Sequence, residues 1–229
     1  MRKPRQIVRP PPPKCPICGS HAFSFGGLAR APGSLPPLCE GCKSVERHRI
    51  IHAAYQPLRP LLRTWRAFQF APDPSVRAEW FASYDSSTYH GSGVDMMNTP
   101  FENGAFDVVI SNHVLEHVAD DRLALAEQFR VVGPEGVVHL CVPNTMWRWD
   151  TRDWGFADPK QNEHYREYGA DFPMMASWAA GEALCIGVLG QDSVTGVYDC
   201  FYFLSRRPKR LELIGNTLQR NKIPVVRFW

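Results

Sequence analysis

The chain has 229 residues, of which 44% are apolar, and its formal net charge is +3. This length and composition predict a globular protein with one α/β domain, alone or with a small module. The slight charge argues against nucleic acid as the partner, and the basic residues near both ends are interpreted as solvated tails. No apolar run reaches the roughly 18 residues that cross a bilayer, so we expect a cytoplasmic protein without a membrane span.

The first part of the chain predicts a flexible arm followed by a metal module. Residues 1–13 include a run of four prolines that cannot form a helix. Residues 14–45 contain two C-x2-C pairs separated by twenty residues, a spacing that brings four thiolates to the corners of a tetrahedron. We predict a structural zinc ribbon rather than disulfides, which a reducing cytoplasm disfavours. Its ligands would be Cys15, Cys18, Cys39 and Cys42.

Residues 46–63 predict a helix that links the ribbon to the rest of the chain. Apolar residues recur there at near-helical intervals, Ser44 is the expected N-cap, and Pro57 and Pro60 break the continuation. The polar side chains of its first half either face a ligand or form a solvated or ribbon-packing surface; they are Arg47, His48, Arg49 and His52.

Residues 64–205 predict a doubly wound α/β domain. Apolar segments at 66–71, 106–111 and 136–142 are typical of buried strands, and 120–132 is typical of an amphipathic crossover helix. Such an alternation implies a parallel sheet that binds ligands at the carboxyl ends of its strands. We therefore expect ligand loops after Phe70, Tyr84, Val94, Ile110 and Val142.

The rest of the chain is expected to complete this domain. A helix over 170–181 and two strands at 183–190 and 197–205 predict the closing helix and a terminal antiparallel pair. Residues 206–229 form a C-terminal extension whose apolar end predicts docking on the domain or on a partner subunit.

One motif permits a different chemistry. His113, Glu116 and His117 have the H-x-x-E-H spacing of zinc hydrolases, in which two histidines share a helix face with a general base. Here the motif directly follows a predicted strand and precedes a new helix start at Asp120, whereas a hydrolase would place it within a long helix. A metallohydrolase therefore stays a remote alternative.

The middle of the chain resembles a known family. Residues 95–143 contain, in order, an acidic residue, a Pro-Phe pair, Phe-Asp opening a strand, Leu-Glu-His-Val after it, and E-x-x-R-V-x-x-P-x-G before the next strand. This ordered set resembles the central half of class I, type 11-like, S-adenosylmethionine-dependent methyltransferases. The resemblance implies a Rossmann-like sheet, S-adenosylmethionine as cofactor and methyl transfer as the activity.

The resemblance extends to a bacterial subfamily that carries a zinc ribbon. Residues 39–49 have the pattern C-x-x-C-x-S-x-E-R-H-R, and the first strand of the domain ends in F-A-P-D-P-S. This subfamily lacks the usual glycine-rich cofactor loop, and 69–76 contains no glycine. The cofactor carries no phosphate, so a turn and an N-capped helix start at Asp73-Pro74 would suffice.

The resemblance also implies the cofactor contacts. Asp73 would meet the ammonium or serve only as a cap, and Asp85 would bind the ribose hydroxyls or be a simple turn residue. Asp95 would face the adenine amino group and Met96 would cover the ring, unless Met96 is core filler. The remaining predicted contacts, at the first loop and at the methionyl end, are Ala71, Asn112 and His113.

Methyl transfer from a sulfonium depends mainly on alignment of the acceptor, and a hydroxyl acceptor also benefits from a general base. The candidate bases are His113, His117 and His164, the last within an aromatic insertion at 144–169. Five side chains of this insertion are expected to form either a lid over the acceptor or a packed surface loop: Trp147, Trp149, Trp154, Tyr165 and Arg166. A divalent cation held by His113, Glu116 and His117 is an alternative, by similarity to ubiquinone-pathway O-methyltransferases. The expected acceptor is a small molecule, sugar or biosynthetic intermediate, free or carrier-bound, methylated at oxygen or nitrogen. A degenerate methyltransferase fold that binds a protein partner through the ribbon or the C-terminal tail is the main alternative.

Overall fold

A seven-stranded sheet forms the centre of the protein. The computed structural model describes residues 12–26, 33–88, 93–143 and 145–228, so most of the predicted arm lies outside the described residues. The strand order is β11-β9-β10-β6-β5-β3-β4, with the last four strands parallel and the first three antiparallel. The strands are β3 (Arg66–Phe70), β4 (Ser83–Ser87), β5 (Val108–Asn112), β6 (Val137–Cys141), β9 (Leu184–Gln191), β10 (Tyr198–Ser205) and β11 (Val225–Phe228). The three buried strands predicted from the sequence and the antiparallel pair are confirmed.

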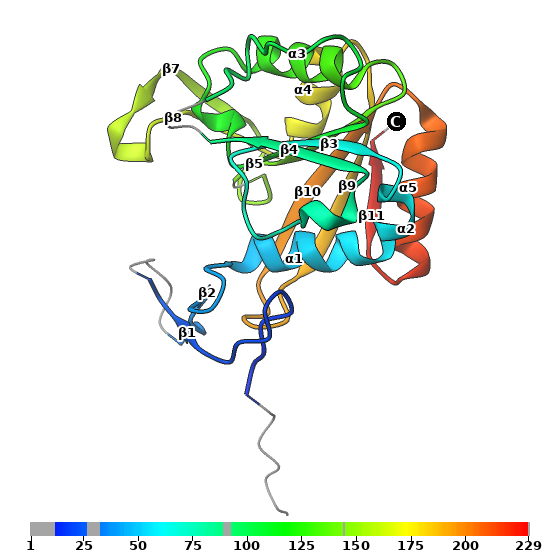
Figure 1. Cartoon of the computed structure of the whole chain (residues 1–229). Coiled ribbons are helices and arrows are strands. Elements are labelled where there is room, and N and C mark those ends of the chain that lie inside the picture. Colours follow the sequence, from blue (N-terminus) through cyan, green and yellow to red (C-terminus); the bar gives the residue numbers. More distant parts are fainter. Residues whose placement is uncertain (1–11, 27–32, 89–92, 144, 229) are drawn as a thin grey trace, which may run out of the picture.

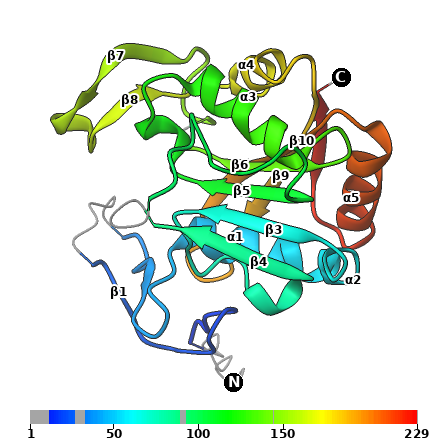
Figure 2. The ribbon, with the colours of Figure 1, turned by 45° about the horizontal axis from the view of Figure 1, so that its top comes forward.

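Helices cover both faces of this sheet (Figures 1 and 2). One face carries α3 (Asp121–Val132) and α4 (Phe172–Ala179), and the other carries α1 (Glu46–Tyr55), α2 (Arg59–Leu62) and α5 (Pro208–Arg220). Each face has its own apolar cluster, one that includes Phe129 and Phe172 and one that includes Tyr55 and Leu211. The fold is therefore a three-layer, Rossmann-like α/β fold, as predicted.

The crossover helix α3 forms as the sequence predicts. The Asp120 side chain accepts a hydrogen bond from the amide of Leu123 at 2.9 Å, and Gly133 ends the helix at φ +65°. Leu125, Phe129 and Val132 recur on one side and are buried under the sheet. Because β5 and β6 are neighbouring parallel strands, α3 closes a right-handed unit whose loops meet at the carboxyl ends of the strands.

The segment between β3 and β4 differs from the prediction. Asp73 Oδ1 accepts a hydrogen bond from the amide of Ser75 at 2.7 Å, but a turn follows rather than an α-helix. Arg77 is extended, and its guanidinium donates to the carbonyl of Ile17 in the ribbon at 2.7 Å. The predicted helix N-cap role of Asp73 is therefore wrong: its carboxylate caps a turn, and the chain after the turn is extended where Arg77 contacts the ribbon.

The linking helix begins at Glu46, the first residue of the predicted segment, but its N-cap differs from the predicted one. Val45, not Ser44, is the N-cap, and its amide donates to Nδ1 of His48 at 3.1 Å. The hydroxyl of Ser44 instead lies 3.2 Å from the sulfur of Cys42. Pro57 and Pro60 divide the rest into a 3-10 turn and the short α2. Ser44 was misjudged because a sulfur atom competes for the hydroxyl that would otherwise cap the helix.

The C-terminal segment docks on the domain itself. Helix α5 packs over the antiparallel strands, and β11 adds to the sheet beside β9, with Val226 opposite Gly187. The loop predicted after Tyr84 starts later, because β4 continues to Ser87. A turn follows Val94 as predicted, although Val94 ends no strand. Among the described residues, no helix is both long and apolar enough to span a membrane.

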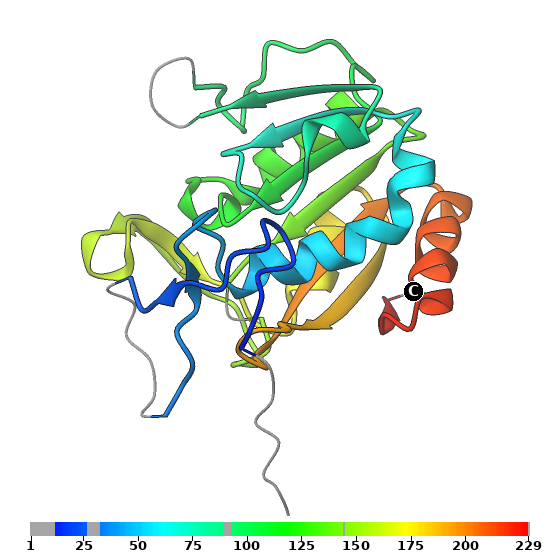
Figure 3. The ribbon, with the colours of Figure 1, turned by 60° about the horizontal axis from the view of Figure 1, so that its bottom comes forward.

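The predicted insertion forms a hairpin beside the sheet. Strands β7 (Arg152–Asp158) and β8 (His164–Glu167) pair with each other and not with the central sheet. In Figures 1 and 3 this hairpin lies at the end of the sheet where β3 and β4 finish. It therefore stands where ligands are expected to bind.

Candidate active site

A cavity of about 740 Å³ opens at the carboxyl ends of β3, β4 and β5. Five of the predicted site residues line it, namely Ala71, Asp95, Met96, His113 and His117. The sequence did not single out several other wall residues, among them Ser87 at the end of β4 and Val118 after the Leu-Glu-His turn. Ala157 and Asn162 of the hairpin also belong to the wall, together with Tyr165, which was predicted for a substrate lid. The hairpin therefore completes one side of the cavity.

Two residues on the wall adopt left-handed backbone without being glycine. Ala71 has φ +46° and His113 has φ +54°, and each directly follows a parallel strand. Such backbone costs an L-residue about 1–2 kcal/mol. The amide of Ala71 donates to the carbonyl of Ser87 at 2.9 Å, which ties the two strand ends together. The chain thus makes the left-handed turn that glycine usually provides, and strain of this kind concentrates at functional sites.

Asp95 and Met96 form the next part of the wall. Oδ1 of Asp95 accepts a hydrogen bond from the amide of Met97 at 2.8 Å, which fixes the direction of the carboxylate. Asp95 is exposed, whereas Met96 is only 3% exposed and contacts the amide nitrogen of Gln128 through its sulfur. An acidic acceptor thus stands beside an apolar surface, an arrangement suited to a planar heterocycle that bears an amino group.

Four predicted site residues do not line the cavity. Asp85 is exposed in the middle of β4, two residues before the strand ends, and His164 lies behind His117 with ring centroids 4.6 Å apart. Asp73 and Asn112 bind each other instead, with the Asn112 amide donating to Asp73 Oδ2 at 3.0 Å. The sequence could not separate wall residues from neighbours one or two positions away, because the ends of strands are its least certain feature.

Asn112 and Asp73 belong to a buried polar chain beneath the cavity. Asn112 Oδ1 lies 2.9 Å from Nε2 of His139, and Nδ1 of His139 lies 3.0 Å from the hydroxyl of Tyr55. His48 stands 3.7 Å from Asp73 Oδ2. Burial lowers the pKa of His139 to about 3 and, with nearby arginines opposing Asp73, that of His48 to about 4. Both histidines are therefore neutral in the folded protein at neutral pH.

These histidines predict acid sensitivity. The unfolded chain protonates histidine below about pH 6.5, but the folded chain cannot, so stability is full above that pH and is lost as the pH falls. For His139 alone we expect the free energy of unfolding to be about 2 kcal/mol lower near pH 5 than near pH 7.5. Urea titration at both pH values measures the drop. The loss of unfolding free energy between the two pH values should be smaller in His139→Phe, by the contribution of His139, and unchanged in the exposed His21→Phe. Equal losses in the two variants would contradict the assignment to His139.

The H-x-x-E-H motif does not share one helix face. Only Leu115–His117 is helical, as the 3-10 turn η3, and His113 lies before it in left-handed backbone. The spacing rule of a hydrolase helix needs regular α-helix across both histidines, so the structure agrees with the sequence context in disfavouring a hydrolase site. His117 instead meets His164 from β8.

Glu116 and its neighbouring histidines are desolvated. Burial raises the pKa of Glu116 to about 8 and lowers the pKa values of His113, His117 and His164. Nearby Arg47 further lowers the pKa of His113. The imidazoles are therefore uncharged near neutral pH, as a proton acceptor or a metal ligand must be.

Arg166 of β8 holds the hairpin against η3. Its guanidinium donates to the carbonyls of Val118 at 2.7 Å and Ala119 at 2.8 Å, and to Asp153 Oδ2 at 2.7 Å. Arg166 is 2% exposed, so it is a buried clamp and not the predicted lid residue. Of the other predicted lid residues, Trp147 and Trp149 are more than 80% exposed, with values of 81% and 84%.

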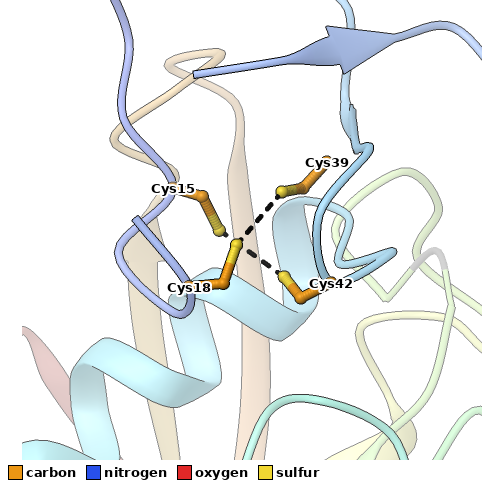
Figure 4. Close-up of side chains that lie close together, drawn as sticks. All are labelled: Cys15, Cys18, Cys39 and Cys42. Carbon is orange, nitrogen blue, oxygen red and sulfur yellow. Dashed lines mark hydrogen bonds between the residues drawn. The ribbon is translucent and has the colours of Figure 1, made fainter. Parts of the chain in front are cut away.

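The cysteine module is brought together as predicted (Figure 4). Zn–S bonds of about 2.3 Å in a tetrahedron place sulfur atoms about 3.8 Å apart. The Cys15 and Cys42 sulfur atoms lie 3.7 Å apart, those of Cys18 and Cys39 lie 3.5 Å apart, and all four lie within 4.8 Å of one another. The geometry fits a closed four-thiolate zinc site.

Two glycines shape the turns of the ribbon, and its strands and apolar cluster are small. Gly19 turns the first knuckle at φ +80°, and a Cβ at Gly41 would lie 3.1 Å from the sulfur of Cys18. The two strands, β1 (Phe23–Ser24) and β2 (Leu38–Cys39), have two residues each. Among the described residues of the ribbon, its buried apolar cluster has three members, Cys15, Ile17 and Cys39. A core this small needs a metal for stability.

A buried ion pair joins the ribbon to the sheet. The guanidinium of Arg49 in α1 binds both carboxylate oxygens of Asp192 at 2.7 Å, and both side chains are fully buried. The same guanidinium donates to the carbonyls of Pro37 at 2.8 Å and Ser44 at 3.0 Å in the ribbon. Figures 1 and 3 show the ribbon beside the N-terminal end of α1.

Comparison with known proteins identifies the chemistry of this fold. Residues 76–140 match the family model described as a methyltransferase domain, and this segment contains β4, β5 and α3 with much of the cavity wall. The match covers 65 of the 229 residues, and together with the Rossmann-like sheet it supports S-adenosylmethionine-dependent methyl transfer as the activity. No curated protein matches the chain.

Solved structures give only distant neighbours. A possible histamine N-methyltransferase of Thermotoga maritima is 14% identical, with 70% of this chain and 91% of that chain covered and a TM-score of 0.41. DesVI of Streptomyces venezuelae is 13% identical, with 69% and 92% covered and a TM-score of 0.45. The CurJ carbon methyltransferase is 10% identical, with 72% and 56% covered and a TM-score of 0.48. At these values the neighbours carry no argument about the acceptor.

Proposed function

We propose that the cavity binds S-adenosylmethionine and that the protein transfers its methyl group to an oxygen or nitrogen of a small-molecule acceptor. The observation that carries the proposal is the position of the cavity at the carboxyl ends of β3, β4 and β5, with Asp95 and Met96 on its wall. This is where open α/β sheets bind ligands. Its volume of about 740 Å³ is in the range of small-molecule and cofactor sites.

The chain's own residues suggest how the cofactor would lie. Asp95 would accept a hydrogen bond from the adenine amino group while Met96 packs on the ring. Ser87, rather than Asp85, would approach the ribose, because Ser87 ends β4 and lines the cavity. The methionyl part would lie between the turns at Ala71 and His113. When bound, S-adenosylmethionine supplies an electrophilic methyl group. The cavity wall would position this methyl group and exclude water.

The acceptor would enter beside the hairpin. His113 and His117 line the cavity with uncharged imidazoles, so either can take the proton that an oxygen or nitrogen acceptor releases. Tyr165 and Asn162 of the hairpin segment add an aromatic ring and an amide, which suit a small polar acceptor such as a sugar or a biosynthetic intermediate, free or carrier-bound.

The zinc ribbon has a structural role in this proposal. Four thiolates leave no open position for water or substrate, so the ion would hold the knuckles together without entering the chemistry. We also assign the chain to the ribbon-bearing methyltransferase subfamily on the four-cysteine module and the glycine-free first loop.

Calorimetric titration of the zinc-loaded protein with S-adenosylmethionine tests the site. Asp95→Asn keeps the acceptor for the Met97 amide but removes charge, so we expect binding to weaken about 10-fold or more, as for loss of a charged hydrogen bond. Asp85→Asn is the matched control and should bind as the wild type does. Weakening by the Asp85 variant alone would place the cofactor elsewhere, and absence of heat in the wild type would favour a protein-binding role for a degenerate fold.

A further inference from the structure

Glu116 is a buried carboxylate without a hydrogen bond. Its side chain is fully buried in η3, and neither Oε1 nor Oε2 has a hydrogen-bond partner within the described residues. Nδ1 of His113, an imidazole that is uncharged near neutral pH, lies 3.5 Å from Oε1 of Glu116. A buried carboxyl group without a hydrogen-bond partner is destabilising, so this position calls for a ligand.

Two imidazoles face the same point. Ligand atoms of Glu116, His117 and His164 all lie within 4.8 Å of one another. His117 lines the cavity, while His164 comes from β8, forty-seven residues further along the chain. Packing alone does not require these three groups to meet. Removing a carboxylate and two imidazoles from water is unfavourable, so their convergence needs another reason.

The surrounding contacts hold these groups in place. Arg166, two residues after His164, donates to the carbonyls of Val118 and Ala119 just after η3. The indole of Trp154 donates to the carbonyl of His164 at 2.9 Å. The backbone on both sides of the cluster is therefore fixed, as a preorganised ligand set requires.

We propose that Glu116, His117 and His164 bind a divalent transition-metal ion next to the cavity, at the point where His117 lines its wall, separate from the ribbon zinc. One carboxylate and two imidazoles suit Fe²⁺, Co²⁺, Zn²⁺ or Mn²⁺ better than Mg²⁺, which prefers oxygen ligands. Three protein ligands leave coordination positions open, and His117 is the ligand that lines the cavity. His113 is not part of this set, in contrast to the ligand set considered from the sequence, and stays a free imidazole on the wall.

The role of the ion rests on the proposed function. A cation beside the acceptor would bind an acceptor hydroxyl and lower its pKa, and His113 would then receive the proton. The binding of the ion itself needs no methyl transfer and can be measured alone.

Titration of the zinc-loaded full chain with Co²⁺ tests the proposal. Cobalt at nitrogen and oxygen ligands gives visible d–d absorption without the thiolate charge-transfer bands of a ribbon site. We expect the wild type to take up Co²⁺ without losing zinc. Glu116→Gln keeps the shape of the side chain, and His164→Phe keeps the ring contact with His117 while removing its nitrogen ligand. Each should weaken Co²⁺ binding by more than about 100-fold.

His113→Asn is the matched control. Asparagine tolerates left-handed backbone, and the variant should weaken Co²⁺ binding far less than Glu116→Gln does. Thermal unfolding without cobalt verifies folding, and if His164→Phe does not fold, Glu116→Gln decides. No uptake beyond the ribbon, or unchanged affinity in Glu116→Gln, would overturn the proposal. Titration of the same samples with S-adenosylmethionine distinguishes failure of this site from failure of the proposed function.

Discussion

Replacement of Arg49 by Met is expected to lower the free energy of unfolding by about 3–5 kcal/mol, the usual cost of leaving a buried charge without its partner. Both oxygens of Asp192 would lose their bonds to the guanidinium, and both side chains are fully buried. The carbonyls of Pro37 and Ser44 would also lose a donor. Urea unfolding of the zinc-loaded protein measures the effect.

An exposed ion pair provides the control for Arg49. Arg207 pairs with Glu135 at the surface, where the two side chains are 55% and 60% exposed. Arg207→Met should change stability by about 1 kcal/mol or less. The loss of stability in Arg49→Lys should lie between the losses in Arg49→Met and Arg207→Met, because lysine keeps the charge but not the two-point contact. Equal losses for Arg49→Met and Arg207→Met would show that the buried pair does not join the ribbon to the sheet.

Replacement of Cys39 by Ser is expected to release the zinc and unfold the ribbon while the central sheet stays folded. Structural zinc contributes roughly 10 kcal/mol of binding free energy to modules of this kind, and the ribbon has few other buried contacts. We expect zinc to be lost and proteolysis to become fast within residues 14–45. Metal analysis and limited proteolysis measure both effects.

Cys200→Ser is the matched variant for the zinc experiment. The sulfur of Cys200 lies 3.0 Å from the hydroxyl of Thr145 and 3.4 Å from that of Tyr202, so serine can keep polar contacts there. This variant should retain zinc and resist proteolysis in the ribbon. A Cys39→Ser protein that keeps its zinc, or that loses the whole sheet at once, would contradict a separately folding metal module.

Local signals in the sequence predicted much of the fold. Apolar runs located β3, β5 and β6, and the cap at Asp120 located the start of α3, because these signals act within a few residues. The cysteine spacing brought together four sulfur atoms for the same reason. Asp95 and Met96 were found on the cavity wall because an ordered run of motifs fixes their position relative to β5.

The remaining features of the fold and the site depend on contacts that a local sequence pattern does not predict. Arg49 and Asp192 are 143 residues apart in the sequence. His164 joins Glu116 and His117 only because Arg166 clamps the hairpin on η3. The H-x-x-E-H spacing misplaced His113, because the backbone there is left-handed and not helical. Asp85 was chosen over Ser87 since the end of β4 could not be fixed to within two residues.

The central claim is that the cavity beside β3, β4 and β5 is the cofactor site. A crystal structure of the zinc-loaded protein with S-adenosylhomocysteine tests it most directly. The account predicts density for the nucleoside between Asp95 and Met96, the ribose near Ser87, and the sulfur facing His113 and His117. Density at any other place, or an empty cavity at saturating ligand, would contradict it.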